Sequence, residues 1–133
     1  MLLRLMLVAL LATVPGAAWS QDLRRDGRLI GKVESDGSVR LNGKLVGKFE
    51  SDGDFRVGGR LTGRIESDGD IRIGGKLTGK VEADGDVRIN GTIVGKVEND
   101  GTVRRNGRII GSAKGVARRQ AAVIFFFDVF KPP

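Results

Sequence analysis

The sequence predicts an all-β protein in which five β-hairpin repeats close into a radial, barrel-like array. Three observations lead to this prediction: a 16-residue unit recurs without interruption, each unit carries two glycine-containing turn signals, and apolar residues alternate with polar ones between the turns. A unit this small cannot bury its apolar face alone, so the copies must pack against one another. A half copy at 26–30 precedes the five full copies, which span residues 31–46, 47–62, 63–78, 79–94 and 95–110.

Residues 1–20 have the pattern of a secretory signal peptide. Arg4 gives a positive start, an apolar run follows, and Ala18-Trp19-Ser20 fits a cleavage site of small residues. The apolar run is shorter than the roughly 20 residues that cross a bilayer. We therefore expect a bacterial protein that is secreted or periplasmic, with one β-repeat domain over residues 21–133 and no transmembrane segment in the mature chain.

The first turn signal of each repeat is an Asp-Gly pair, as in Ser35-Asp36-Gly37. Glycine is favoured there because the turn needs a positive φ, which other residues adopt at a cost. A three-residue loop with a glycine bulge places Val33 opposite Val39 on one apolar face, so we predict that loop.

The second turn signal is Asn-Gly or Gly-Gly, as in Asn42-Gly43. A two-residue loop here would place Leu45 on the wrong face. A three-residue loop that begins at Leu41 would set Val39 opposite Leu45, and we predict this loop because a one-residue slip would send the apolar side chains to solvent.

The long strand of each repeat has a glycine at its centre, such as Gly47. A glycine inside a strand often marks a close approach of another part of the chain, so we expect these glycines to face a crowded centre. The predicted core residues are Val33, Val39, Leu45, Phe49, Phe55, Leu61, Ile65, Ile71, Leu77, Val81, Val87, Ile93, Val97, Val103 and Ile109.

A β-solenoid is the alternative architecture for this period. Its rungs would stack equivalent arginines about 4.8 Å apart, and like charges directly opposite one another are destabilising. The paired turn signals also require chain reversals, which a rung does not need. We therefore favour the closed array over the solenoid.

The segment 121–130 is almost wholly apolar and holds four of the six phenylalanines, namely Phe125, Phe126, Phe127 and Phe130. We interpret it as a strand that is buried on both faces and completes the core. The alternative is a docking strand for a sister chain or a membrane partner.

The repeat pattern Asp-Gly-x-Val-Arg, followed by Gly-x-x-[Ile/Val]-Gly, and the ending 113–127 resemble the small secreted bacterial five-fold β-flower proteins. The resemblance covers about residues 26–130 and implies five hairpin petals around an axis, without implying any catalytic or ligand-binding residue. The repeats also resemble, more weakly, bactofilin-like filament solenoids.

The composition argues against an enzyme. The chain has no histidine, cysteine or tyrosine, and its one tryptophan lies in the expected signal peptide, so the most common general base and thiol nucleophile are missing. The acidic cluster Glu50, Asp52 and Asp54 recurs in later repeats, which favours a structural role over a single catalytic site. Asp-Gly turns supply oxygen ligands of the kind calcium prefers, but basic residues flank every turn. We predict no catalytic residue, no metal and no cofactor, and leave calcium binding at the turns open.

One arginine in each repeat lies on the predicted outer face, and the formal net charge of the chain is +7. These arginines form a possible anion-binding surface: Arg40, Arg56, Arg72, Arg88 and Arg104. Nucleic acid is not expected as a partner, because aromatic residues for base stacking are missing. We therefore expect an exported, non-enzymatic protein with a structural or assembly role. The sequence does not identify its partner, for which a second copy of the chain and an anionic envelope component are the two candidates. The alternative is a binding module for an anionic component of the cell envelope.

Overall fold

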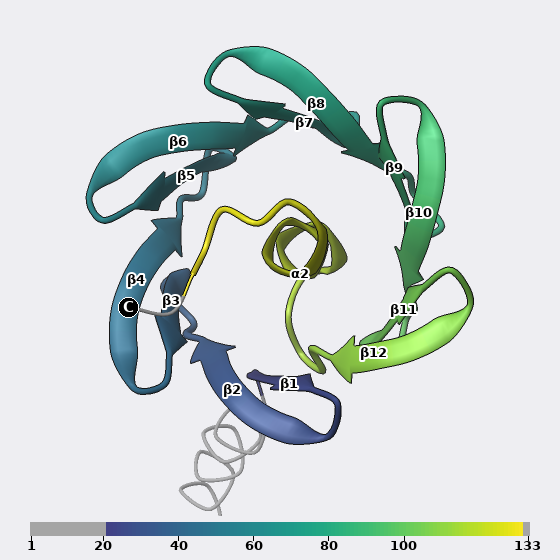
Figure 1. Ribbon diagram of the computed structural model, residues 1–133. Helices are drawn as coiled ribbons and strands as arrows, with labels where there is room; N and C mark the ends of the chain where they lie inside the picture. Colours follow the sequence, from purple (N-terminus) through teal and green to yellow (C-terminus); the bar gives the residue numbers. More distant parts are fainter. Residues whose placement is uncertain (1–20, 132–133) are drawn as a thin grey trace, which may run out of the picture.

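A closed antiparallel barrel surrounds a short helix in the computed structural model, which describes residues 21–131 (Figure 1). Each strand pairs with its neighbours in sequence, and the first strand pairs with the last to close the ring. The predicted all-β class and the closed array are thus confirmed; stacked solenoid rungs are not what these residues form. The described residues form twelve strands and the helix α2: β1 (Asp22–Arg25), β2 (Arg28–Val33), β3 (Ser38–Leu41), β4 (Lys44–Phe49), β5 (Asp54–Val57), β6 (Arg60–Ile65), β7 (Asp70–Ile73), β8 (Lys76–Val81), β9 (Asp86–Ile89), β10 (Thr92–Val97), β11 (Thr102–Arg105), β12 (Arg108–Ser112) and α2 (Arg118–Phe126).

The strands form six hairpins, one more than the number of complete repeats. The half copy becomes a full hairpin because β1 pairs with β2 along its length, from Asp22 opposite Lys32 to Arg25 opposite Arg28. The other edge of β1 pairs with β12, where Arg25 lies opposite Gly111. The start of the described chain therefore closes the ring that its last hairpin leaves open.

The loop that connects one hairpin to the next follows the prediction. Val33 lies opposite Val39, and the Gly37 amide donates a hydrogen bond to the Glu34 carbonyl at 2.9 Å. Gly37 has a φ of 92°, and a Cβ placed on it would lie 2.0 Å from the carbonyl oxygen of Phe49. Glycine is needed here because the backbone has a positive φ and because there is no space for a side chain.

The predicted three-residue loop at the second turn is wrong. Leu41 pairs with Lys44 across a two-residue turn, in which Asn42 and Gly43 have φ values of 52° and 81°, as a type I′ turn requires. The register then shifts: Arg40 lies opposite Leu45, and Val39 lies opposite Gly47. Val46 is the extra residue between these two pairs and forms a β-bulge. Because of the bulge, β4 again has the inward-facing side chains that the short turn alone would have placed outside.

This bulge overturns part of the predicted core. Leu45 shares the outer face with Arg40 and is 58% exposed. The same correction applies to four other predicted core residues, which are also exposed: Leu61, Leu77, Ile93 and Ile109. Leu29 occupies the equivalent position in the first hairpin and is exposed as well.

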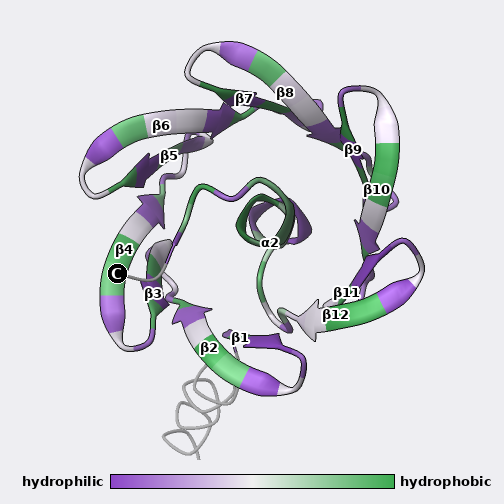
Figure 2. Cartoon of the chain, viewed as in Figure 1, coloured by the Kyte–Doolittle hydropathy of each residue, from purple (hydrophilic) through white to green (hydrophobic). Residues whose placement is uncertain are grey.

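The predicted C-terminal strand over 121–130 is instead the helix α2 followed by an irregular segment (Figure 1). Every strand already has two neighbours, so the barrel offers no edge to a further strand. A helix satisfies its own backbone hydrogen bonds, which suits a segment enclosed in an apolar interior. Figure 2 shows this mostly apolar segment at the centre of the ring, and residues 121–127 are all buried.

The prediction that the central glycines face a crowded centre is confirmed. A Cβ on Gly79 would lie 2.3 Å from the backbone oxygen of Arg88 and 2.8 Å from the ring of Phe127. Three more rings of the central segment contact equivalent glycines: Phe125 on Gly111, Phe126 on Gly95 and Phe130 on Gly47. The missing side chains thus make room for the aromatic rings inside the barrel.

Candidate functional site

The barrel has two chemically different ends. Along an antiparallel barrel, hairpin turns and connecting loops alternate, so all turns of one kind gather at one end. We call the end with the two-residue turns (26–27, 42–43, 58–59, 74–75, 90–91 and 106–107) the tip end. We call the end with the connecting loops (34–37, 50–53, 66–69, 82–85 and 98–101) the loop end.

The five arginines predicted as an anion-binding surface each form an ion pair with the glutamate six residues earlier. The Nε–Oε2 distance is 2.9 Å for Arg40 with Glu34, and 3.0 Å for Arg56 with Glu50. The remaining pairs are Arg72–Glu66 at 3.0 Å, Arg104–Glu98 at 2.8 Å, and Arg88–Glu82. Their positive charges are therefore balanced within the chain, and anion binding by these arginines stays a prediction.

These ion pairs also offset a repulsion between neighbouring strands. Arg72 lies directly opposite Arg64 in the pairing of β6 with β7, and like charges in such positions destabilise a sheet. Glu66 pairs with Arg72, while the Nη1 of Arg64 lies 3.0 Å from the Oδ1 of Asp54. The outer face is thus a network of alternating charges.

The acidic clusters that the sequence repeats are part of this network. Oxygen atoms of Glu50, Asp52 and Asp54 lie within 4.8 Å of one another. Glu50 pairs with Arg56, Asp54 pairs with Arg64, and Asp52 accepts a hydrogen bond from the Asp54 amide at 3.0 Å. Each carboxylate already has a partner within the chain, which explains the clustering.

The aspartate of the connecting loop stabilises its own turn. The Oδ1 of Asp36 accepts a hydrogen bond from the Ser38 amide at 2.9 Å, and this bond lowers the pKa of Asp36 below its usual value. The Thr102 amide lowers the pKa of Asp100 in the same way. Both side chains remain charged at neutral pH and are exposed at the loop end.

The four phenylalanines predicted for an assembly strand lie inside the chain's own barrel. Phe125, Phe126, Phe127 and Phe130 are each less than a tenth exposed. The ring of Phe130 also contacts those of Phe49 and Phe55, with centroid distances of 5.2 Å and 6.1 Å. In this arrangement the four rings offer little surface to a second molecule.

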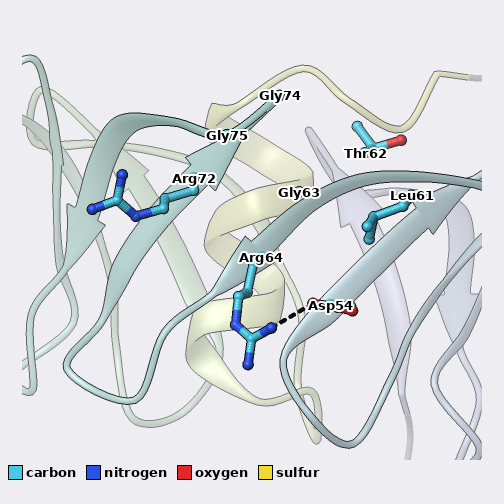
Figure 3. A pocket seen from close by; sticks show the side chains of 8 residues that line it. All are labelled: Asp54, Leu61, Thr62, Gly63, Arg64, Arg72, Gly74 and Gly75. Carbon is cyan, nitrogen blue, oxygen red and sulfur yellow. Dashed lines mark hydrogen bonds and ion pairs between the residues drawn. The ribbon is translucent and has the colours of Figure 1, made fainter.

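A shallow groove runs between adjacent hairpins on the outer face (Figure 3). Leu61 lies along one wall, while Arg72 and the turn Gly74-Gly75 belong to the next hairpin. Equivalent grooves lie beside Leu29, Leu45 and Leu77. Each of these grooves therefore combines an exposed leucine with an open shape, unlike the enclosed cavities that are typical of small-molecule sites.

Sequence reasoning missed two arginines at the tip end, Arg25 and Arg105. Their guanidinium carbons lie 4.9 Å from the ring centroids of Phe125 and Phe126, respectively. The signal was present in the aligned repeats, because the equivalent positions in the other hairpins are Leu41, Val57, Ile73 and Ile89.

Charge is divided unevenly between the ends. The loop end carries five aspartates that take part in none of the ion pairs found in residues 21–131, namely Asp36, Asp52, Asp68, Asp84 and Asp100. Lys114, Arg118 and Arg119 lie near this end, since Gly101 packs against Lys114 and the two arginines donate hydrogen bonds to Ala83 and Ser67. The tip end is mostly basic, with Arg24, Arg25, Arg28, Lys44, Arg60, Lys76, Arg105 and Arg108 beside the turns and Asp26 within one of them.

A ring of hairpins whose interior is filled by its own chain defines a closed β-repeat protein. A family model described as "Bactofilin: Polymer-forming cytoskeletal" matches residues 40–117, more than half of the 133 residues. The chain belongs to the bactofilin family. The predicted membership of the five-fold β-flower proteins is therefore wrong, and the weaker resemblance named the right family.

Neither a curated protein nor a solved structure matches the chain. Among residues 21–131, no helix is long and apolar enough to cross a membrane. The expected signal peptide at 1–20 lies outside the described residues.

Proposed function

We propose that this protein is a non-enzymatic structural subunit that assembles into polymers. The observation that carries the proposal is the match of residues 40–117 to a polymer-forming cytoskeletal family. The fold is compatible with this role, because the interior is packed by the chain's own aromatic rings and the two ends present exposed charges of opposite sign.

Head-to-tail contact between barrels is the mode of assembly that the charges favour. The basic tip end of one copy is complementary to the exposed aspartates at the loop end of the next. Both ends repeat hairpin by hairpin around the same axis (Figure 1). A contact between two different surfaces of the same molecule leaves one of each surface free at the ends, so it produces open filaments unless the ring closes.

Export of the protein through residues 1–20 is part of this proposal. The pattern of these residues supports it, and a polymer outside the cytoplasm would then form in the bacterial envelope or beyond it. Detection of a mature chain that begins at Gln21 in a fractionated native host tests this point, and recovery of an uncleaved chain in the cytoplasm would contradict it.

Charge exchange between the two ends tests head-to-tail assembly. One variant, K44E/R60E/K76E, makes the tip end acidic; a second, D52K/D68K/D84K, makes the loop end basic. We expect sedimentation and electron microscopy to show polymers of the native protein at low salt, and no polymers of either variant alone. An equimolar mixture of the two variants should again polymerise, because each altered end then finds an oppositely charged partner.

Circular dichroism of each variant establishes that the barrel is folded before assembly is compared. Polymers that form equally well from the single variants would contradict assembly through these ends. A native protein that stays monomeric at low salt would contradict the proposed function itself.

A further inference from the structure

Two neighbouring hairpins break the repeat pattern in the same way. In β3, β5, β7 and β9, the last residue is aliphatic, whereas β1 and β11 end on Arg25 and Arg105. A single strand, β12, separates β1 from β11 in the barrel, so the strands that carry the two arginines lie about 10 Å apart at the usual strand spacing. Along β12, Arg25 lies opposite Gly111 and Arg105 lies opposite Arg108. The exceptions therefore gather in one place instead of being scattered around the ring.

Both arginines face another arginine across their hairpin. Arg25 lies opposite Arg28, and Arg105 lies opposite Arg108. The equivalent pairs in the other hairpins join an aliphatic residue to a lysine, an arginine or a threonine, as for Leu41 with Lys44 and Ile89 with Thr92. Like charges directly opposite destabilise a sheet, so these two hairpins carry a repulsion that the other four avoid.

No carboxylate of the described residues pairs with these four arginines, in contrast to the five arginines of the outer face. All four side chains are exposed. The guanidinium planes of Arg25 and Arg105 lie by the rings of Phe125 and Phe126, which limits their motion and leaves their N–H groups available. The fold thus holds four unpaired guanidinium groups together at the tips of two adjacent hairpins.

We propose that these four arginines, Arg25, Arg28, Arg105 and Arg108, form a binding site for a phosphate-bearing anion with at least two negative charges. Guanidinium groups bind phosphate oxygens through paired N–H donors, which favours arginine over lysine at such sites. A bound polyanion would also relieve the repulsion within each Arg–Arg pair. Residues that destabilise the protein in the absence of a ligand are expected at functional sites.

Calorimetric titration with sodium pyrophosphate tests the proposal, at an ionic strength at which sedimentation shows the native protein and every variant to be monomeric. The variant R25L/R105L introduces the residue found at the equivalent position 41, and R28T/R108T introduces the residue found at position 92. We expect both variants to bind pyrophosphate at least about tenfold more weakly than the native protein, from the loss of charge-assisted hydrogen bonds. The control K44T/K76T removes the same charge from two other tips and should bind within about twofold of the native protein, because exposed charges outside the site act through a screened field.

Further experiments identify the molecule that carries the phosphate. Co-sedimentation with cardiolipin vesicles that is lost in R25L/R105L would assign the site to a lipid headgroup with two phosphates. Binding of pyrophosphate without such co-sedimentation would assign it to a soluble ligand. Equal weakening in K44T/K76T would reduce the effect to overall charge and overturn the site. Binding of citrate as tightly as pyrophosphate would overturn the phosphate assignment, and the absence of binding to both pyrophosphate and the vesicles would overturn the proposal. The four arginines differ from the residues exchanged in the assembly test, and the titration is made on monomeric protein, so either proposal can fail without the other.

Discussion

At the scale of single residues, glycine has two separate uses in this chain. Gly79 lies in a strand with its missing side chain turned toward the central segment, whereas Gly91 has a φ of 81° in a turn with open space around it. The first position excludes a side chain by contact, and the second disfavours one by backbone conformation.

The substitution Gly79→Ala should lower the free energy of unfolding by about 1–3 kcal/mol or more, because the new methyl group must displace the backbone of Arg88 or the ring of Phe127. Urea denaturation followed by circular dichroism measures the change. Gly91→Ala serves as the control and should cost only about 1 kcal/mol, which is the backbone penalty alone. A larger loss of unfolding free energy in Gly91→Ala than in Gly79→Ala would show that packing at the centre does not exclude a side chain at position 79.

Asp36 should make the stability of the barrel depend on pH. Its pKa is lowered in the folded state by the hydrogen bond from the Ser38 amide, so the charged form is favoured by folding. This contribution is fully present above the unfolded-state pKa of about 4. It is lost as the pH falls through the lower pKa of the folded state.

Asp36→Asn keeps an oxygen acceptor but cannot be charged, so it isolates this contribution. We expect the native protein to be more stable than the variant at neutral pH. The difference should shrink as the pH falls below about 4 and should vanish only below the lower pKa of the folded state. Thermal unfolding at several pH values measures it, and a difference that does not change between neutral and acidic pH would contradict the assignment.

At the scale of elements, the sequence predicted one turn correctly and the other incorrectly for a physical reason. Alternation places Val33 opposite Val39 in only one register, so the connecting loop could be derived. At Asn42-Gly43, alternation alone favoured a longer loop, but a β-bulge after the two-residue turn gives the same inward face further along the strand. The position of a bulge depends on the closed barrel, which the local sequence does not contain.

The segment at the C-terminal end shows a second limit. A short, continuous apolar run has no clear period, so a buried strand and a buried helix cannot be distinguished from it. The central role of Phe125–Phe127 could be expected from their apolar character, but their helical arrangement depends on the absence of a free strand edge. Arg25 and Arg105 depart from the repeat, so a pattern defined by what the repeats share does not predict them.

The central helix should contribute a large part of the stability of the fold. Replacement of Phe126 by Ala removes a buried ring that contacts Gly95, and should lower the free energy of unfolding by about 3–5 kcal/mol. Leu45→Ala provides the matched control on the outer face, where the side chain is 58% exposed, and should change stability by no more than about 0.5 kcal/mol. Chemical denaturation of both variants measures the difference, and similar losses in the two would contradict a supporting role of the helix.

At the scale of the whole molecule, the ring is completed by segments far apart in the sequence. β1 pairs with both β2 and β12, and α2, which follows the last hairpin in the sequence, fills the interior. Five complete repeats thus produce a barrel of six hairpins, because the residues around them supply the missing half of the sixth.

The closed sheet limits the ways in which this protein can assemble into a polymer. Each strand of the barrel is paired on both edges with strands of the same molecule. An incoming chain therefore cannot extend the sheet by main-chain hydrogen bonding, as happens in amyloid-like fibres. Growth must depend on side chains instead, and the ionic contacts proposed between the two ends would weaken as salt is added. An assembly of these barrels would therefore come apart into intact, folded subunits that can be used again.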